Sequence, residues 1–417
     1  MIGDFKRFDM VKKPKRQKRY LTPVTWAVSF PSKWARRAKI KKTGMAGIKP
    51  PYLLLCNHNS FLDFKIMTAA IFPHRANYVV AIDGFLHMEW LLRRVGAIGN
   101  RKFVNSTLLV KNMIHAKNNG DIVVMFPEAR YSLCGTSAVL PNSVGKFIRL
   151  LGIPVVTLIM HGHHVQAPFW GEKGRGASHL ESELRLLFTP EETKSLTVDE
   201  INTRLRAAFK YDDFAWQRDR QVKIPHTDRA RGLHKVLYQC PECGAEYRMS
   251  SVRDELWCQV CGQRWNMSQY GELSAVNGVT RFSHIPDWYE WERENVRREI
   301  REGTYSLKVS AIVDSLPNTR GFKELGEAEL CHNMDGFTLK GTYRGEPYEE
   351  TWKPRSLYSC HIEYDYKHRR ADCIDLNTAT DTLYIYPQGR DFAVTKIALA
   401  TEELYEFTGK PNLANAN

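Results

Sequence analysis

The sequence predicts an α/β protein with a mixed sheet covered by helices, followed by a small cysteine-containing unit and an antiparallel β-rich unit that ends in a helix. Apolar runs alternate with helical periodicity over residues 52–160, and this alternation is typical of a largely parallel or mixed sheet. Two CxxC pairs mark residues 226–272, whereas residues 306–417 are rich in aromatic and β-branched side chains. A chain of 417 residues is long enough for two or three domains.

The elements of the first half follow from short apolar runs and from helix signals. Gly120 and Gly152 each end a helical pattern, and Thr197 with Glu200 forms a capping box that begins a further helix. Strands are predicted at residues 53–56, 78–82, 122–126, 155–160 and 184–188, and helices at 65–70, 86–91, 105–116 and 144–150.

The second half has a different pattern. Residues 285–302 place apolar side chains among many charges and predict an amphipathic connecting helix. Turn signals at Asp335-Gly336 and Arg344-Gly345 predict an antiparallel unit, and a last helix is predicted near residues 401–404. The domains expected from these changes of character are 1–44, 45–225, 226–272, 273–305 and 306–417.

The basic residues are concentrated at the N-terminus. Residues 1–42 contain fourteen Lys and Arg against two Asp, so they carry +12 of the formal net charge of +14. Such an arm suits an anionic surface, either lipid headgroups or nucleic acid, or serves as a solvated tail. Apolar and aromatic residues over 24–30 and Trp34 lie among these cations, which favours a segment that lies on a membrane.

Composition also bears on localisation. No stretch reaches the ~20 apolar residues that are needed to cross a bilayer, and the basic start is not followed by the apolar core of a secretory signal. Four of the nine cysteines form CxxC pairs and the others are scattered, which fits a reducing compartment. We therefore expect a cytoplasmic protein that is peripheral on the inner face of the membrane.

Two short polar strings are candidates for chemistry. His58-Asn59-Ser60-Phe61-Leu62-Asp63 follows the strand predicted at 53–56, and Phe126-Pro127-Glu128-Ala129-Arg130 follows the strand at 122–126. Because reactive groups collect beyond the carboxyl ends of strands in open α/β sheets, the two strings should meet in one crevice. His58 can serve there as a general base, and Asp63 in the first turn of a helix can fix its tautomer.

Each string also has a purely structural interpretation. Ser60 and Asp63 can simply cap a helix, with His58 as a polar turn residue. Glu128 and Arg130 can form a surface ion pair in a loop. An arginine guanidinium also offers a planar fork that matches a phosphate group.

Together, in this order and each after a strand, the strings resemble the glycerolipid acyltransferases, the family that includes 1-acylglycerol-3-phosphate acyltransferase. His58 and Asp63 match the HxxxxD motif of that family. Residues 126–130 match much of its FPEG-x-R motif, although Ala129 replaces the usual glycine and Arg130 comes one position early.

Two weaker matches extend the resemblance to about residues 45–210. Gly99-Asn100-Arg101 supplies the arginine of the second motif without its usual aromatic neighbours, and Ile153-Pro154-Val155 fits the fourth motif. The departures from the family motifs at Ala129 and around Arg101 bear on which acceptor the protein uses more than on the reaction that it catalyses.

The resemblance implies a reaction and roles for the matching residues. His58 would deprotonate a hydroxyl of a lysophospholipid such as 1-acylglycerol 3-phosphate, which attacks the thioester of acyl-CoA or of an acyl carrier protein during phospholipid synthesis. Asp63 would orient His58. Arg101 and Arg130 are candidate ligands of the acceptor's phosphate, and Glu128 would hold an arginine or the acceptor hydroxyl. No acyl-enzyme is needed, so Cys56 is interpreted as a buried strand residue.

The paired cysteines form a second motif. Cys240 and Cys243 are separated by fourteen residues from Cys258 and Cys261, and a glycine follows each pair. Four thiolates on two tight turns can hold one tetrahedral Zn²⁺, so this pattern resembles a zinc ribbon with a structural zinc ion. The ribbon can bind nucleic acid or protein, or connect two domains.

Three features leave alternatives open. His161, His163 and His164 follow a predicted strand, but no further metal ligand can be placed, so they are interpreted as crevice-lining or loop histidines. Residues 306–417 weakly resemble a pleckstrin-homology-like barrel. A nucleic-acid-binding protein that uses the basic arm and the ribbon is the alternative function; a nucleic acid partner is not expected, because only an acyltransferase explains both strings.

Overall fold

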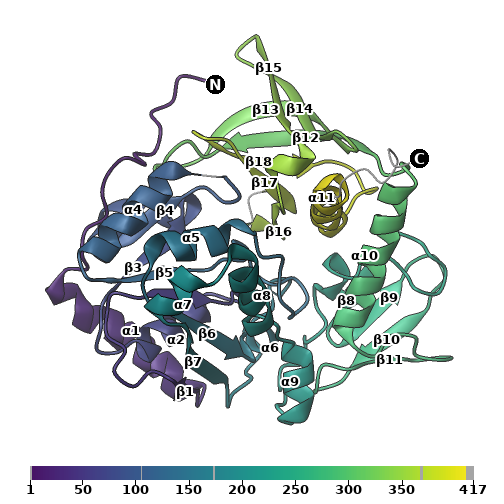
Figure 1. Ribbon diagram of the computed structural model, residues 1–417. Coiled ribbons are helices and arrows are strands. Elements are labelled where there is room, and N and C mark those ends of the chain that lie inside the picture. Colours follow the sequence, from purple (N-terminus) through teal and green to yellow (C-terminus); the bar gives the residue numbers. More distant parts are fainter. Residues whose placement is uncertain (1, 105, 172–173, 367–369, 410–417) are drawn as a thin grey trace, which may run out of the picture.

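The computed structural model describes residues 2–104, 106–171, 174–366 and 370–409. These residues form a seven-stranded mixed sheet, a four-stranded antiparallel sheet and a second seven-stranded sheet, which is antiparallel (Figure 1). The predicted fold class, a mixed α/β sheet followed by separate antiparallel sheets, is confirmed.

The first sheet brings the two predicted strings together. Its order is β1-β7-β6-β2-β5-β3-β4, and β2 lies between β5 and β6 with all three strands parallel. The antiparallel pair β6–β7 makes the sheet mixed. The strands are β1 (Lys39–Thr43), β2 (Leu53–Cys56), β3 (Ala76–Ala81), β4 (Ala97–Asn100), β5 (Ile122–Met125), β6 (Val155–His161) and β7 (Glu181–Phe188).

Helices cover both faces of this sheet. Leu53 and Leu55 of β2 pack in one apolar cluster and Leu54 in another, because successive side chains of a strand point to opposite faces. The sequence patterns missed β1, β4 and the first helix. The helices are α1 (Thr22–Ala35), α2 (Leu62–Ala70), α3 (Glu89–Arg94), α4 (Thr107–Asn118), α5 (Ser143–Leu151), α6 (His163–Gln166), α7 (Pro190–Ser195), α8 (Val198–Ala208) and α9 (Asp213–Asp219), with short 3₁₀ turns at Arg19–Leu21 and Ile82–Phe85.

The basic N-terminal segment lies along the body of the protein. Residues 2–18 form neither helix nor strand, yet Phe8 is buried beside Phe85, and its amide donates a hydrogen bond to the carbonyl oxygen of Pro317 (2.8 Å). The Arg7 guanidinium pairs with Asp381. This segment therefore links the first sheet to the C-terminal sheet.

The four-stranded sheet packs against a long helix. Its order is β11-β10-β9-β8, and the ring of Trp265 on β10 lies 5.0 Å from that of Trp288 on α10 (Ile285–Arg301). The strands are β8 (Met249–Val252), β9 (Glu255–Cys258), β10 (Arg264–Met267) and β11 (Leu273–Ala275), and a 3₁₀ turn at Leu233–Lys235 precedes them.

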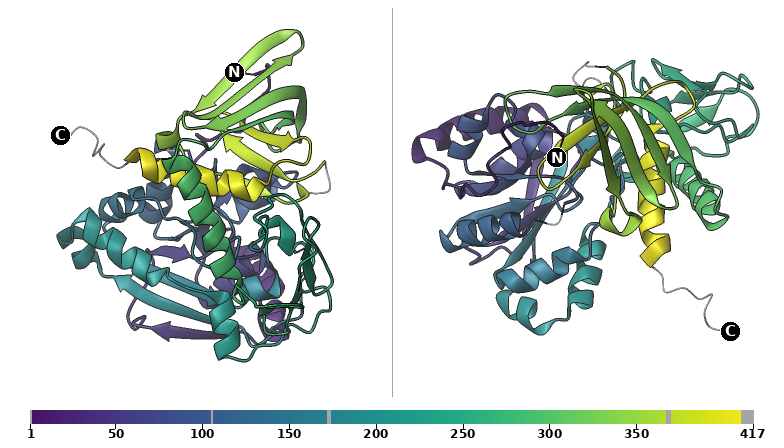
Figure 2. Two further views of the ribbon diagram at one scale, coloured as in Figure 1. Left: turned by 90° about the vertical axis from the view of Figure 1, so that its right-hand side faces the viewer. Right: turned by 90° about the horizontal axis from the view of Figure 1, so that it is seen from above.

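The last sheet has the order β15-β14-β13-β12-β18-β17-β16 and is followed by α11 (Val394–Gly409). Figure 2 shows α11 between this sheet and the first half of the chain. The resemblance to a pleckstrin-homology-like barrel stays a prediction. The strands are β12 (Leu307–Ser315), β13 (Lys323–Asn333), β14 (Gly336–Tyr343), β15 (Glu346–Trp352), β16 (His361–Glu363), β17 (Cys373–Asn377) and β18 (Thr382–Pro387), with a 3₁₀ turn at Pro354–Ser356.

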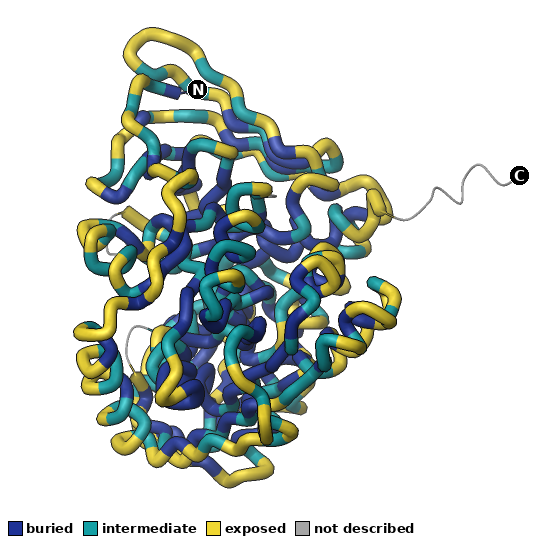
Figure 3. The backbone as a smooth tube through the Cα atoms, turned by 60° about the vertical axis from the view of Figure 1, so that its left-hand side comes forward, coloured by how far each residue is buried: buried dark blue, intermediate teal, exposed yellow. Residues whose placement is uncertain are grey.

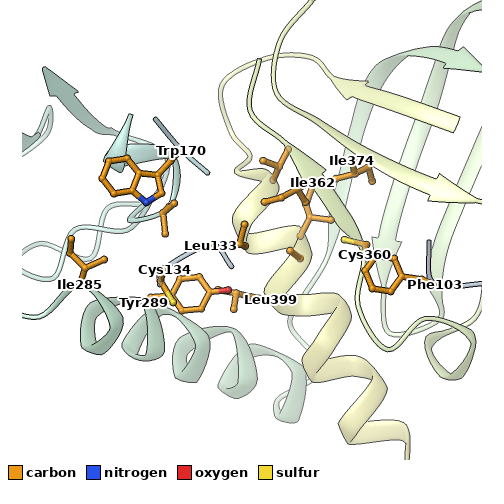
Figure 4. Packing of buried hydrophobic residues seen from close by; sticks show 14 of the residues in the cluster. Phe103, Leu133, Cys134, Trp170, Ile285, Tyr289, Cys360, Ile362, Ile374 and Leu399 are labelled. Atoms are coloured by element: carbon orange, nitrogen blue, oxygen red, sulfur yellow. The ribbon is translucent and has the colours of Figure 1, made fainter. Parts of the chain in front are cut away.

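One apolar core connects all three sheets. The same cluster contains Leu54 of β2, Trp265 of β10 and Ile385 of β18, and Figure 3 shows buried backbone through the interior of the molecule. Cys134, which follows β5, lies beside Tyr289 of α10 and Leu399 of α11 (Figure 4). The C-terminal half is therefore packed onto the first sheet rather than tethered to it.

Candidate active site

His58 and Glu128 follow the neighbouring parallel strands β2 and β5. The register pairs Leu55 of β2 with Met125 of β5, so both chains leave the sheet at the same edge. The backbone amide of His58 donates a hydrogen bond to Glu128 Oε2 (2.9 Å). The two strings thus meet at the carboxyl edge of the sheet, as expected for an open α/β fold.

Asp63 lies in the first turn of α2 and accepts a hydrogen bond from His58. His58 Nδ1 is 2.9 Å from Asp63 Oδ2, and the amides of Asn59 (2.6 Å) and Ser60 (2.9 Å) donate to the same oxygen. Burial raises the pKa of Asp63, but the hydrogen bonds with His163 and His58 outweigh this effect and lower the pKa to about 2. The ionised carboxylate can only accept a hydrogen bond, so the neutral imidazole that donates to it carries its proton on Nδ1, and its Nε2 can act as a base.

The His58 side chain is the partly open member of this pair. Its side chain is 23% exposed, whereas that of Asp63 is fully buried. The imidazole stacks on Phe126 at 4.1 Å and contacts Tyr131 at 4.2 Å, measured between ring centroids. The imidazole thus packs against two aromatic rings and stays partly open to solvent.

His163 was interpreted as a crevice-lining or loop histidine, but its hydrogen bond to Asp63 was not predicted from the sequence. It begins α6, directly after β6, and its Nδ1 is 2.6 Å from Asp63 Oδ1. The position of the histidines after a strand was the available signal, because β6 is the other parallel neighbour of β2. Of the three histidines in this string, only His163 hydrogen-bonds Asp63 among the described residues.

Glu128 supports the backbone of the site. Its buried carboxylate accepts hydrogen bonds from the amides of His58 (Oε2, 2.9 Å) and Ala138 (Oε1, 2.9 Å). Burial, partly offset by these two backbone hydrogen bonds, raises the pKa of Glu128 to about 7. We expected Glu128 to hold an arginine or an acceptor hydroxyl, but amide donors use both of its oxygens.

A cavity of about 480 Å³ is lined in part by Ala138, whose amide donates to Glu128. The loop 137–142 forms one wall, and Phe209, Tyr358 and Tyr405 line the rest together with Arg206, Lys210 and Glu406. Because Ala138 in this wall is bonded to Glu128, one side chain connects the cavity to the loop that carries His58.

The two arginines that we expected to bind phosphate have partners within the chain. The Arg130 guanidinium is 2.7 Å from Glu402 of α11 and is 5% exposed. Arg101 donates to Thr382 Oγ1 (2.7 Å) and to the carbonyl oxygen of Thr380 (2.7 Å). In this conformation neither guanidinium is open to a phosphate group, and their role as substrate ligands stays a prediction.

Ala129 departs from the usual glycine at a position where the backbone prefers one. Its φ angle is +56°, in the left-handed region that is strained for residues with a Cβ atom. The turn after β5 therefore has the left-handed backbone conformation that favours glycine, although alanine occupies position 129.

The four cysteines of the CxxC pairs converge. All four sulfur atoms lie within 4.8 Å of one another, and the pairs Cys240–Cys261 and Cys243–Cys258 have Sγ–Sγ distances of 3.8 Å. Zinc–sulfur bonds of about 2.3 Å give a tetrahedron with edges of about 3.8 Å, so the geometry fits a metal ion. Gly244 and Gly262 follow the two pairs with φ angles of +76° and +75°.

Part of the chain matches a known protein family. Residues 36–161 match the family model described as Acyltransferase, which spans less than half of the chain. A search of curated proteins gives no match. Among solved structures, the chain is similar to the 1-acyl-sn-glycerophosphate (LPA) acyltransferase PlsC from Thermotoga maritima, with 13% identity and a TM-score of 0.35, over 46% of this chain and 79% of that one. The residues that match the Acyltransferase family model, 36–161, contain the His58–Asp63 pair.

Proposed function

We propose that this protein transfers an acyl group from a thioester, acyl-CoA or an acyl carrier protein, to the hydroxyl of a lysophospholipid such as 1-acylglycerol 3-phosphate. The observation that carries the proposal is the 2.9 Å contact between His58 Nδ1 and a buried Asp63, with the imidazole partly open at the carboxyl edge of the sheet. A base held in one tautomer beside an open edge suits transfer to a hydroxyl group.

The proposed reaction needs no covalent enzyme intermediate. His58 Nε2 takes the proton of the acceptor hydroxyl while the oxygen of that hydroxyl attacks the carbonyl carbon of the thioester. The tetrahedral intermediate collapses with cleavage of the carbon–sulfur bond, and the imidazolium returns the proton to the departing thiolate. Cys56 is an unsuitable nucleophile, because burial and the neighbouring Asp63 raise the pKa of its thiol.

An apolar surface beside the site supports a membrane-bound acceptor. Phe61, three residues after His58, is 70% exposed, and exposed apolar side chains continue along α1 and the end of α2. The Trp26 ring of α1 packs on Phe72, two residues after the end of α2, at 4.7 Å, so the two helices lie side by side. We call the exposed apolar side chains of this region the apolar face. The exposed members of this apolar face are Val24, Val28, Trp34, Phe61 and Phe72.

We propose that the apolar face rests on an anionic membrane from the cytoplasmic side. Lys33, Arg36 and Arg37 lie on or directly after α1, where they can meet lipid headgroups while the apolar side chains enter the interface. Among the described residues, no helix is long and apolar enough to cross a bilayer.

Sedimentation with vesicles tests this surface. The double substitution Val24→Glu and Val28→Glu should reduce binding to vesicles that contain phosphatidylglycerol, whereas Val279→Glu, at an exposed position of the four-stranded sheet region, should not. Equal binding by all three proteins would remove the apolar face from the proposal. Adding RNA in place of vesicles tests the alternative partner of the basic arm.

We further propose that the cysteine cluster holds a structural zinc ion. Four thiolates would complete a tetrahedral shell and leave no position for substrate. Cys240, Cys243, Cys258 and Cys261 would be the ligands, and the ion would fix the turns that frame the four-stranded sheet.

A substitution of the base tests the catalytic proposal. His58→Ala should abolish transfer of a labelled acyl group to a panel of glycerol 3-phosphate, lysophosphatidate and other lysolipids, while the protein stays folded. His226→Ala removes an exposed histidine outside the site and serves as the matched control. An unchanged rate in His58→Ala would falsify the assignment, and the product of the active panel member identifies the acceptor.

A further inference from the structure

We infer that His163 is a positioning residue for the catalytic pair, which holds Asp63 in the orientation that His58 needs. This inference rests on the proposed function. The carboxylate of Asp63 lies between two imidazoles, with His58 Nδ1 on one oxygen (2.9 Å) and His163 Nδ1 on the other (2.6 Å). The two histidines are 105 positions apart and follow the adjacent strands β2 and β6.

The donors on Asp63 are unevenly distributed. Oδ2 accepts from His58 and from the amides of Asn59 and Ser60. Oδ1 has one hydrogen-bond partner among the described residues, and this partner is His163. Without it, half of a fully buried carboxylate would lack a donor, and the carboxylate plane could turn away from His58.

The backbone places His163 in this position. Gly162 joins β6 to α6 with a φ angle of +81°, and a Cβ atom there would lie 2.6 Å from the Trp216 ring and 2.8 Å from Leu180. Only glycine fits this turn, and the turn brings the next side chain, that of His163, to Asp63. The His163 side chain is consequently fully buried.

The surroundings of the two ring nitrogens of His163 indicate which of them carries a proton. Its Nδ1 faces an ionised carboxylate, so this nitrogen carries a proton, and its Nε2 is buried without a partner among the described residues. A neutral imidazole with its proton on Nδ1 satisfies both conditions. His163 is therefore a fixed donor that makes no contact with the reacting atoms.

Two substitutions separate positioning from packing. His163→Leu fills the space without a donor, whereas the amide nitrogen of His163→Asn can take the place of Nδ1. We expect kcat to fall about 10- to 100-fold in His163→Leu, as for loss of one hydrogen bond to a charged group, with KM changed less than about twofold. His163→Asn should restore kcat to within about threefold of the parent. His164→Leu is the control, because His164 is a buried neighbour whose ring makes no hydrogen bond to any residue that the structure describes.

An NMR measurement makes the test independent of activity. In protein with ¹⁵N-labelled histidine, the Nδ1 proton of His58 should give a downfield signal in the parent and in His163→Asn, and this signal should shift or broaden in His163→Leu. Equal kinetic losses in both variants with an unchanged His58 signal would overturn the inference. If His163→Leu fails to fold, a lost His58 signal in folded His163→Asn overturns it.

The two proposals fail in different ways. Full acyl transfer by His58→Ala would end the proposed function, but the NMR comparison would still decide whether His163 fixes the Asp63–His58 contact. Conversely, the parent could be active while the His58 signal stays the same in the His163 variants. That result would support the proposed function and show that His163 has no positioning role in it.

Discussion

Arg130 and Glu402 are 272 positions apart in the sequence and form an ion pair of 2.7 Å that is almost completely buried. Arg130 belongs to the string after β5, and Glu402 lies on α11. Glu402 also accepts from Arg293 of α10 (2.8 Å) and from Ser359 (2.7 Å). One carboxylate thus joins the predicted substrate motif to the connecting helix and the C-terminal helix.

Neutralising Glu402 should destabilise the whole chain. Glu402→Gln leaves the buried Arg130 guanidinium without its charge partner and removes one of the carboxylates that contact Arg293, which keeps Glu403 and Glu290. Loss of one member of a buried ion pair costs about 3–5 kcal/mol. Chemical denaturation measures this change. Glu406→Gln, an exposed position one turn along α11, should change the free energy of unfolding by less than about 0.5 kcal/mol. Similar stability of both variants would contradict the prediction.

The same carboxylate predicts a loss of stability in acid. Burial raises the pKa of Glu402, but Arg130 and Arg293 outweigh burial and lower it to about 2, compared with about 4.3 in an unfolded chain. Because the folded-state pKa is the lower one, this stabilisation is complete above about pH 4.3 and disappears as the pH falls through 2. It amounts to the order of 3 kcal/mol. The stability difference between the parent and Glu402→Gln should therefore shrink from pH 6 to pH 2; a constant difference would rule out this linkage.

Restoring the usual glycine at position 129 should stabilise the protein. Ala129 has a φ angle of +56°, and glycine adopts this conformation without the Cβ penalty, so Ala129→Gly should raise the free energy of unfolding by about 1 kcal/mol. Ala207→Gly on the exposed face of α8 should lower it by about 0.5–1 kcal/mol. Thermal unfolding distinguishes the two signs, and destabilisation by Ala129→Gly would refute the strain argument.

Removal of the proposed zinc ion should unfold the four-stranded sheet. We expect one zinc ion per chain in the parent and none in Cys240→Ser, with a lower melting temperature, whereas Cys331→Ser, outside the cluster, should keep both the zinc and the stability. Elemental analysis and thermal unfolding measure these properties. A metal-free parent with four freely reactive thiols would count against a zinc ribbon.

Local sequence patterns predicted the elements that carry the central pair. A four-residue apolar run followed by His58, and a second run followed by Glu128, were enough to expect adjacent strand ends, and the register of β2 and β5 agrees. The CxxC spacing predicted a cluster whose sulfur atoms do converge. These features depend on short segments and on general rules of sheet topology.

Other contacts depend on tertiary packing and could not be read from one segment. A guanidinium that matches phosphate also matches the carboxylate of Glu402, and no pattern near Arg130 distinguishes these partners. His163 required the knowledge that β6 is adjacent to β2. β1 was missed because its exposed lysines hide the apolar alternation that normally marks a strand.

The N-terminal segment has a consequence for how the chain reaches its native state. Arg7 meets Asp381, 374 positions further along, and Phe8 bonds to Pro317. A ribosome synthesises this segment before the residues that receive it. Phe8 and its neighbours must therefore stay exposed until Pro317 and Asp381 have been synthesised, and nascent chains should gain protection from proteases at residues 2–18 only after that point.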